Sequence, residues 1–394
     1  MPKQILEGSR AIALAVKNIA PAVVAAYPIT PQTHIVEALA KFKADGEADF
    51  EFLRAESEFA AASMIVGAAA AGVRTYSATS SQGLLLMNEV IYNIAGMRLP
   101  VVITCANRAV SAPINIWNDQ QDMHTVSPAG WVHFFAENNQ EAVDQHILAF
   151  KIAEEAKLPV MVNVDGFVLT HTYEPVAIPT AKEIKKFLPA YKPAKGEYLD
   201  PASPATLGAF ATPAHYMEIR EELHNDLTAS FDLINKEYEK IKKMLRRDIL
   251  AAYDNGLVEY AGPKNPKTII VAMGSILGTI KDAVDEMNKK SSLPPFIKEG
   301  IGVLKIKTYR PFPAEAILNI IKKAKYVAVI DKAITLGHMG PLAADIKAAA
   351  QGKMSGKIQS FIAGLGGRDI TKEMIKKIVK EVEGRDEGVR FVGK

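Results

Sequence analysis

The sequence predicts an α/β fold with two doubly wound parallel-sheet domains. Short apolar runs alternate with longer amphipathic runs, and this alternation occurs twice along the 394 residues. Short apolar strands between amphipathic helices are typical of a parallel sheet that helices cover on both faces. A proline-rich stretch without this alternation separates the two units, which places the connection between the two sheets there.

The first alternating unit comprises residues 1–175. Its expected strands are 23–27, 75–79, 100–105 and 159–164, and its expected helices are 8–18, 32–43, 56–71, 82–95 and 140–155. Parallel strands present their carboxyl ends at one edge of a sheet. Residues that directly follow these strands are therefore expected to line a common crevice.

Residues 176–264 form the connection. Prolines recur between residues 175 and 213, which predicts an extended arm on a surface, and a charged helical pattern follows from 218 to about 254. The second alternating unit comprises residues 265–394. Its expected strands are 268–273, 303–309 and 326–331, and its expected helices are 275–288 and 371–383.

The segment Tyr27-Pro28-Ile29-Thr30-Pro31 joins an expected strand to an expected helix. Its two prolines fix their own backbone torsions and push the preceding residues out of the helical region. Thr30 is therefore expected at the N-cap, with Pro31 as the first helical residue. A strand end that leads into a helix N-terminus favours anion binding, although the same residues also suit a rigid turn without a ligand.

Charge and composition exclude several classes of partner. A net charge of +3 is too small to indicate nucleic acid or a membrane surface. No window reaches the roughly 18 apolar residues that span a bilayer, and no secretory signal is recognisable, so a cytoplasmic protein is expected. The single cysteine, Cys105, is expected to be an inert buried thiol. One cysteine also excludes an iron–sulfur cluster held by this chain alone.

Glu56 and Glu58 are candidates for acid–base chemistry at the start of an expected helix. Two residues apart on a helix, they point about 200° apart, so only one of them can face a given pocket. A carboxylic acid in such a pocket can share a proton with a ring nitrogen. The alternative is that both are solvated glutamates, which favour a helix N-terminus.

Arg108 is a candidate anion ligand because it follows the strand that ends at Cys105. Arginine is the natural bidentate partner of a carboxylate or phosphate. At the carboxyl end of a parallel strand it would face the same crevice as Thr30. The alternative is an ion pair with Asp119 or Asp122.

Three further features have a functional and a structural interpretation. Ile114, Ile116 and Trp117 would form an apolar wall around a substrate side chain, or they would anchor the loop. The turn 79–83 is rich in small hydroxyl residues and either lines a cofactor pocket or caps a helix. The spacing of the glycines in 364–367 matches neither the Rossmann motif nor the P-loop, so a tight turn is the preferred interpretation.

Taken in order along almost the entire chain, these motifs resemble the alpha subunit of the pyruvate:ferredoxin oxidoreductase family, the thiamine-diphosphate-dependent 2-oxoacid oxidoreductases. The motifs are Tyr27-Pro28-Ile29-Thr30-Pro31, Glu56-Ser57-Glu58, Ala78-Thr79-Ser80-Ser81-Gln82-Gly83, Gly96-Met97-Arg98-Leu99-Pro100, Asn107-Arg108, Ser111-Ala112-Pro113-Ile114-Asn115-Ile116-Trp117-Asn118-Asp119, Glu137-Asn138-Asn139-Gln140, Leu199-Asp200-Pro201, Pro213-Ala214-His215-Tyr216, Met273-Gly274-Ser275, Tyr309-Arg310-Pro311-Phe312-Pro313 and Gly364-Leu365-Gly366-Gly367-Arg368-Asp369. So many motifs in register make the resemblance specific.

The resemblance implies a thiamine-diphosphate pyrimidine-binding domain followed by a domain like the carboxyl-terminal domain of transketolase. Glu58 matches the catalytic glutamate that contacts N1′ of the cofactor's aminopyrimidine. Tyr27, Pro28 and Ile29 match cofactor-binding residues. Thr30 and Arg108 match residues that bind the substrate carboxylate.

The resemblance also implies partner subunits. Thiamine enzymes bind Mg2+ and diphosphate through a Gly-Asp-Gly motif, which this sequence lacks. A beta subunit would therefore supply that half of the site, alongside a gamma subunit and a ferredoxin-like subunit with [4Fe-4S] clusters. Soluble ferredoxin or an equivalent protein would accept the electrons, and activity would require the partners.

The expected reaction is CoA-dependent oxidative decarboxylation of a 2-oxoacid, with pyruvate as the default substrate. Thr30 argues against oxalate, because oxalate-using relatives carry arginine there. Branched-chain and aryl 2-oxoacids, another electron acceptor and a non-catalytic scaffold subunit remain as alternatives.

Overall fold

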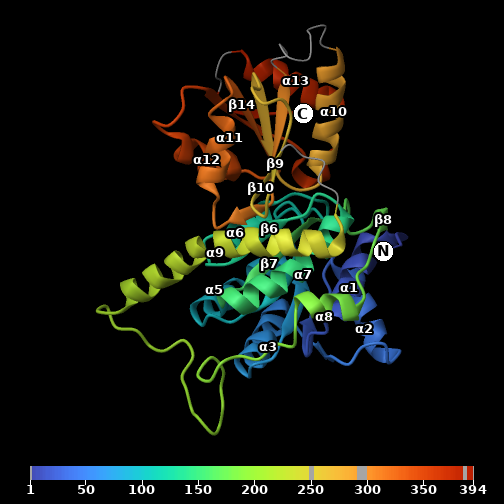
Figure 1. Ribbon diagram of the computed structural model, residues 1–394, viewed down its shortest axis with the longest axis vertical. Coiled ribbons are helices and arrows are strands. Elements are labelled where there is room, and N and C mark those ends of the chain that lie inside the picture. Colours follow the sequence, from blue (N-terminus) through green and yellow to red (C-terminus); the bar gives the residue numbers. More distant parts are fainter. Residues whose placement is uncertain (1, 248–252, 291–299, 385–387, 394) are drawn as a thin grey trace.

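The computed structural model describes residues 2–247, 253–290, 300–384 and 388–393. It contains two α/β units stacked end to end, with the second unit at the top of Figure 1. Helix α9 (Tyr216–Leu245) runs along the junction of the units, and its amino-terminal half projects beyond them together with the preceding arm (Figure 1). Within the described residues, no helix is both long and apolar enough to cross a membrane.

The first unit is a seven-stranded sheet in which every neighbouring pair but one is parallel. Its order is β13 (Thr308–Arg310), β6 (Val132–Phe135), β7 (Val160–Asp165), β5 (Val102–Asn107), β4 (Thr75–Thr79), β2 (Val23–Ala26) and β3 (Glu51–Arg54). Its helices include α1 (Gly8–Ile19), α2 (Thr33–Ala44), α3 (Glu58–Ala70), α4 (Ser81–Leu86), α5 (Asn88–Gly96), α6 (Gln121–Val126) and α7 (Asn139–Ala156). Helix α1 packs against α2 and α7, whereas α3 packs against α5, so helices cover both faces.

The second unit is also a seven-stranded sheet, with a parallel centre and two antiparallel strands at one edge. Its order is β16 (Val389–Phe391), β15 (Lys357–Ile362), β14 (Tyr326–Asp331), β11 (Thr268–Ala272), β12 (Ile301–Ile306), β10 (Val258–Ala261) and β9 (Tyr253–Asp254). Its helices are α10 (Ile276–Lys290), α11 (Ala314–Ile321), α12 (Pro341–Ala350) and α13 (Lys372–Val382). The fold class expected from the sequence is thus confirmed.

One expected strand, 303–309, belongs to both sheets. The chain leaves the second sheet after β12 and pairs β13 with β6 of the first sheet. Lys307 lies between them: its amide donates to the Leu257 carbonyl at 3.0 Å, and its carbonyl accepts from the Phe135 amide at 2.9 Å. The apolar run gave no sign of this switch, because both halves are equally buried.

Other differences from the expected elements have local causes. The charged helix, expected to reach residue 254, ends at Leu245, where Arg246 adopts a left-handed conformation with φ 53°; of the remainder, residues 248–252 lie outside the described residues. The helix expected over 82–95 is interrupted at Met87. Two short strands, β3 and β6, were not expected, although β6 lies in the largely apolar run 131–136. A hairpin of β1 (Gln4–Glu7) and β8 (Tyr173–Val176), and α8 (Ala181–Phe187) in the arm, were also not expected.

A fully buried carboxylate, Asp165 at the end of β7, joins the two units. It accepts from the Ser275 amide at 2.9 Å and the Lys332 ammonium at 3.2 Å, both in the second unit. It also accepts from the side-chain amides of Gln120 at 3.0 Å and Asn118 at 3.2 Å. Burial alone would raise the pKa of Asp165, but the Lys332 charge and the Ser275 hydrogen bonds hold it below its usual range.

We expect Lys332→Met to lower the free energy of unfolding by about 3 kcal/mol, because the Asp165 carboxylate would stay buried without its cation. Urea unfolding followed by circular dichroism measures the change. Lys353→Met is the matched control, since Lys353 is exposed. Equal stabilities of the two variants would show that the Asp165–Lys332 contact contributes nothing to the fold.

Candidate active site

The candidate site lies at the carboxyl edge of the first sheet. The segment 27–31 follows β2, the turn 79–83 follows β4, and Arg108 follows β5. Because these three strands are consecutive neighbours in the parallel sheet, the segments after them meet at one edge. Glu58 opens α3, which packs against both β2 and β4.

The two glutamates of the expected pair lie in different surroundings. Glu58 is the first residue of α3 and is 7% exposed, whereas Glu56 is exposed. Ser57 caps the helix by accepting from the Ala60 amide at 3.1 Å. The sequence alternative in which both glutamates are solvated is therefore wrong: only Glu58 faces the interior of the site.

Gly83 leaves the space that Glu58 occupies. A Cβ at residue 83 would lie 2.7 Å from Glu58 Oε1 and 2.6 Å from Thr79 Oγ1, well inside van der Waals contact. In the turn that follows β4, three buried polar atoms have no hydrogen-bond partner among the described residues: Thr79 Oγ1, Ser80 Oγ and Gln82 Nε2. Buried polar atoms are normally paired, so these groups are free to meet a polar ligand.

Arg108 is 7% exposed, and among the described residues its guanidinium donates only to uncharged oxygens. Its Nε donates to the Asn115 carbonyl at 3.2 Å, one terminal nitrogen to the Thr30 carbonyl at 2.7 Å, and the other to Gln82 Oε1 at 3.1 Å. A guanidinium has five N–H donors, which leaves one on each terminal nitrogen. Burial lowers the pKa of Arg108, while the negative charges of Asp122 and Glu58 oppose that shift.

The alternative interpretation, an ion pair of Arg108 with Asp119 or Asp122, is absent among the described residues. Asp122 instead accepts from the backbone amides of Arg108 at 2.9 Å and Ser81 at 3.0 Å, and from the Asn107 side chain at 3.0 Å. It therefore ties the segment after β5 to the turn after β4. Burial raises the pKa of Asp122. The sequence suggested Asp122 only as an ion-pair partner of Arg108, because hydrogen bonds to backbone amides of distant segments leave no signal in the sequence.

The expectation that Thr30 caps α2 is wrong. Helix α2 begins at Thr33 with Gln32 at the N-cap position, and the described contact of Thr30 is its carbonyl, which accepts from Arg108. Gln32, which is fully buried, organises the segment: its amide donates to the Ala78 carbonyl on β4 and to the Tyr27 carbonyl at 3.4 Å. This role of Gln32 was not recognised from the sequence.

The loop after Arg108 is held by the second unit. The Asn115 side chain donates to the Gly366 carbonyl at 3.1 Å, and the Gly367 amide donates to the Asn118 carbonyl at 2.6 Å. At Gly367, where φ is +81°, a Cβ would lie 2.4 Å from Cβ of Trp117. The glycine turn 364–367 therefore serves as a close-packed support for this loop.

The apolar residues of that loop are accessible to solvent in this chain. Ile114 is 80% exposed, Trp117 52% and Ile116 39%. The Trp117 ring also contacts Phe167, with ring centroids 4.6 Å apart. Cys105 is fully buried as expected, and burial and the nearby Asp122 raise the pKa of its thiol.

Comparison with known families decides the relationship. Residues 14–240 match the family described as "Pyruvate flavodoxin/ferredoxin oxidoreductase, thiamine diP-bdg". Residues 267–375 match "Pyruvate:ferredoxin oxidoreductase core domain II". The chain belongs to the pyruvate:ferredoxin oxidoreductase family.

Similarity within this family extends over whole chains. The chain is 44% identical to pyruvate synthase subunit PorA of Methanocaldococcus jannaschii, covering 99% of this chain and 97% of that one. It is 42% identical to PorA of Methanothermobacter thermautotrophicus, with 100% and 98% covered. The ketoisovalerate oxidoreductase subunit VorA of Pyrococcus abyssi is 37% identical, with 97% and 93% covered.

A solved structure shares the fold at low sequence identity. It is the 2-oxoglutarate:ferredoxin oxidoreductase from Magnetococcus marinus with 2-oxoglutarate, coenzyme A and succinyl-CoA bound. Its TM-score with this chain is 0.71 at 18% sequence identity. The similarity covers 97% of this chain and 66% of that one, so the chain spans about two thirds of the neighbour's length.

We expect Gly83→Ala to lower the free energy of unfolding by about 1–3 kcal/mol, because the new methyl group overlaps Glu58 and Thr79. Gly67→Ala in α3 is the matched control, since a Cβ there has no atom within 4 Å. Alanine is the better helix former by about 1 kcal/mol, so the control should be as stable as the parent or more so. Thermal and urea unfolding of the two variants provide the test, and a stable Gly83→Ala protein would contradict this packing.

Proposed function

We propose that this chain is the alpha subunit of a pyruvate:ferredoxin oxidoreductase of the pyruvate synthase type. The enzyme would convert pyruvate, CoA and oxidised ferredoxin to acetyl-CoA, CO2 and reduced ferredoxin. The observation that carries the proposal is a buried Glu58 beside a buried Arg108, in a chain 42–44% identical to PorA subunits over their whole length. Similarity to VorA is lower, at 37%, which favours pyruvate over branched-chain 2-oxoacids.

The surroundings of Glu58 fit the aminopyrimidine of thiamine diphosphate. This ring presents nitrogen donors and acceptors, and the unpaired Thr79 Oγ1, Ser80 Oγ and Gln82 Nε2 are complementary to such a ligand. When bound, the cofactor supplies a nucleophilic carbon for attack on the keto group. In this proposal Tyr27, Pro28 and Ile29 would also bind the cofactor, as the resemblance of the segment 27–31 implies.

Glu58 would hold a proton between its carboxyl group and the pyrimidine nitrogen N1′. Two features support that role: burial separates the carboxyl from bulk water, and the backbone of Gly83 limits its movement. A hydrogen bond between a carboxylic acid and a ring nitrogen is stronger in such a site than in water. Glu56 is too exposed to substitute for it.

Arg108 would bind and orient the carboxylate of the 2-oxoacid. Its two remaining N–H donors sit on separate terminal nitrogens, which suits both oxygens of one carboxylate. The other donors are fixed by Asn115, Thr30 and Gln82, so little side-chain entropy is lost when the substrate binds. The Thr30 hydroxyl is proposed as a second donor to the same carboxylate.

The remaining parts of the reaction belong to partner subunits in this proposal. The sequence has no Gly-Asp-Gly motif for Mg2+ and diphosphate, and its one cysteine is fully buried. A beta subunit would bind Mg2+ and the diphosphate, a gamma subunit would complete the assembly, and a ferredoxin-like subunit would carry [4Fe-4S] clusters that pass electrons to soluble ferredoxin.

We expect Glu58→Gln to reduce kcat of the assembled complex at least 100-fold, because the amide cannot exchange a proton with N1′. The assay is pyruvate- and CoA-dependent reduction of a low-potential dye, with assembly checked by size-exclusion chromatography. Glu56→Gln, at an exposed position two residues away, should keep full activity. An assembled Glu58→Gln complex with full activity would support a scaffold role instead.

We also expect the chain to be inactive by itself. Supplied with thiamine diphosphate, Mg2+, CoA and pyruvate, it lacks the diphosphate half-site and the electron carriers. Mixing it with the separately purified partner subunits should restore dye reduction. Turnover by the chain alone would contradict the proposed division of labour between subunits.

A further inference from the structure

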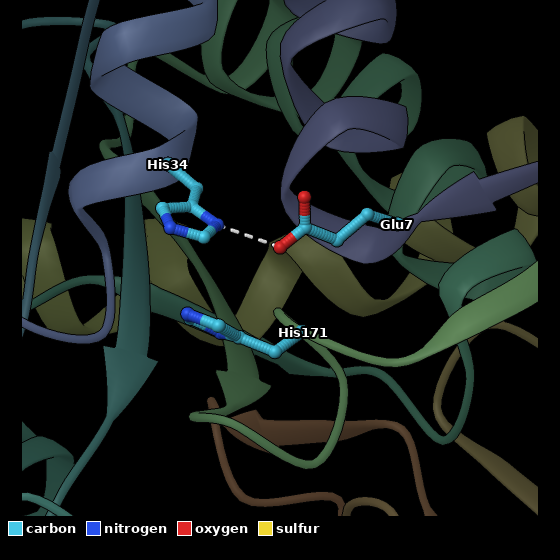
Figure 2. Close-up of side chains that lie close together, drawn as sticks. All are labelled: Glu7, His34 and His171. Carbon is cyan, nitrogen blue, oxygen red and sulfur yellow. Dashed lines mark hydrogen bonds and ion pairs between the residues drawn. The ribbon is translucent and has the colours of Figure 1, made fainter.

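A cluster of metal-ligand side chains lies apart from Glu58, at the start of the first unit. It consists of Glu7, His34 and His171, which approach one another from three different segments (Figure 2). Glu7 ends β1, His34 lies in the first turn of α2, and His171 belongs to the segment between β7 and β8. One ligand atom from each residue lies within 4.8 Å of the other two.

We propose that Glu7, His34 and His171 bind one divalent transition-metal ion of the zinc class. Two imidazole nitrogens and one carboxylate oxygen form a ligand set typical of Zn2+, with water completing the coordination. His34 is exposed and the other two residues are partly buried, so an ion has access from solvent. The acid and the imidazole are already in contact, with His34 Nδ1 2.7 Å from Glu7 Oε1.

His171 is fixed in the way that metal-binding histidines are usually fixed. Its Nδ1 lies 2.7 Å from Thr170 Oγ1, which leaves Nε2 as the free ligand atom. Thr170 is fully buried, accepts from the Phe167 amide at 2.8 Å, and holds the Ser9 hydroxyl through its carbonyl at 2.8 Å. When the second ring nitrogen donates its N–H in such a hydrogen bond, the bond orients the ring and raises its basicity as a ligand.

The backbone around the cluster is already assembled. Strands β1 and β8 pair so that Glu7 lies opposite Tyr173, and α1 packs directly against α2. Tetrahedral ligands about 2.1 Å from Zn2+ lie roughly 3.4 Å from one another. Binding thus requires Glu7 and His34 to separate slightly and His171 to approach, movements that side-chain rotation supplies.

The charges of the cluster suit a cation. Burial and the neighbouring His34 lower the pKa of His171. The Glu7 carboxylate partly opposes that shift and supplies the negative charge. The His34 and His171 rings lie with their centroids 4.5 Å apart and their planes at 34°, and one nitrogen of each ring lies within 4.8 Å of the other and of a Glu7 oxygen.

A bound ion would also restrain the loop beside the proposed active site. The Phe167 ring lies between His171 and Trp117, at centroid distances of 4.7 and 4.6 Å. His34 lies one turn after the segment 27–31. Metal binding would therefore connect the start of α2 to the segment 166–172 and, through Phe167, to Trp117.

Equilibrium dialysis of the whole chain against Zn2+, after treatment with a chelator, tests the proposal. We expect one ion per chain in the parent protein, and at least 10-fold weaker binding in each of the three variants Glu7→Gln, His34→Gln and His171→Gln. His338→Gln is the matched control, because His338 is exposed in the second unit. Co2+ in place of Zn2+ should give visible absorption bands that the same three variants lose.

Thermal unfolding of each variant separates a lost ligand from a lost fold, and exposed His34 provides the variant least able to disturb packing. A folded His34→Gln protein with weakened binding supports the site. Absence of stoichiometric binding by the parent, or binding that His34→Gln and Glu7→Gln leave unchanged, would overturn it. The result is independent of catalytic activity.

Discussion

The buried Asp165 carboxylate is the contact on which both the join between the units and the geometry of the candidate site depend. It lies at the end of β7 and binds Ser275 and Lys332 of the second unit. The same oxygens hold Asn118 and Gln120, which follow the loop that supports Arg108. A buried charge of this kind must be fully paired. The second unit is therefore required to pair the carboxylate that holds the loop next to the site. This explains how a unit that holds none of the proposed catalytic residues fixes the geometry of the candidate site.

Within the first unit, order at the site comes mainly from side chains that bind backbone groups. Asp122 gathers the amides of Ser81 and Arg108, and Gln32 joins the segment 27–31 to the Ala78 carbonyl. Within the described residues, neither the Glu58 carboxyl nor the Arg108 guanidinium forms an ion pair. Such a division between supporting and reacting residues is what a preorganised site requires.

The sequence predicted the fold class, most central strands and the residues that meet at the carboxyl edge, because parallel strands carry a strong apolar signal and their ends share one edge. It did not predict Gln32 or Asp122 as supports, since their partners are backbone groups from distant segments. It placed Thr30 at an N-cap, whereas Gln32 occupies that position and α2 begins at Thr33. Local propensity cannot report contacts such as Gly83 against Glu58, which arise only when two helices meet.

The passage of the chain at Lys307 from one sheet to the other has a consequence for evolution and for protein engineering. Strands β9 and β10 precede residue 265 and pair in the second sheet, while β13 follows it and closes the edge of the first. No single cut in the chain therefore separates the two units, so neither unit can be exchanged for that of another protein without the other. A gene split in the connecting region would leave β6 as a bare edge strand, open to association with other chains. Recombination that preserves this architecture must retain the two units as a pair.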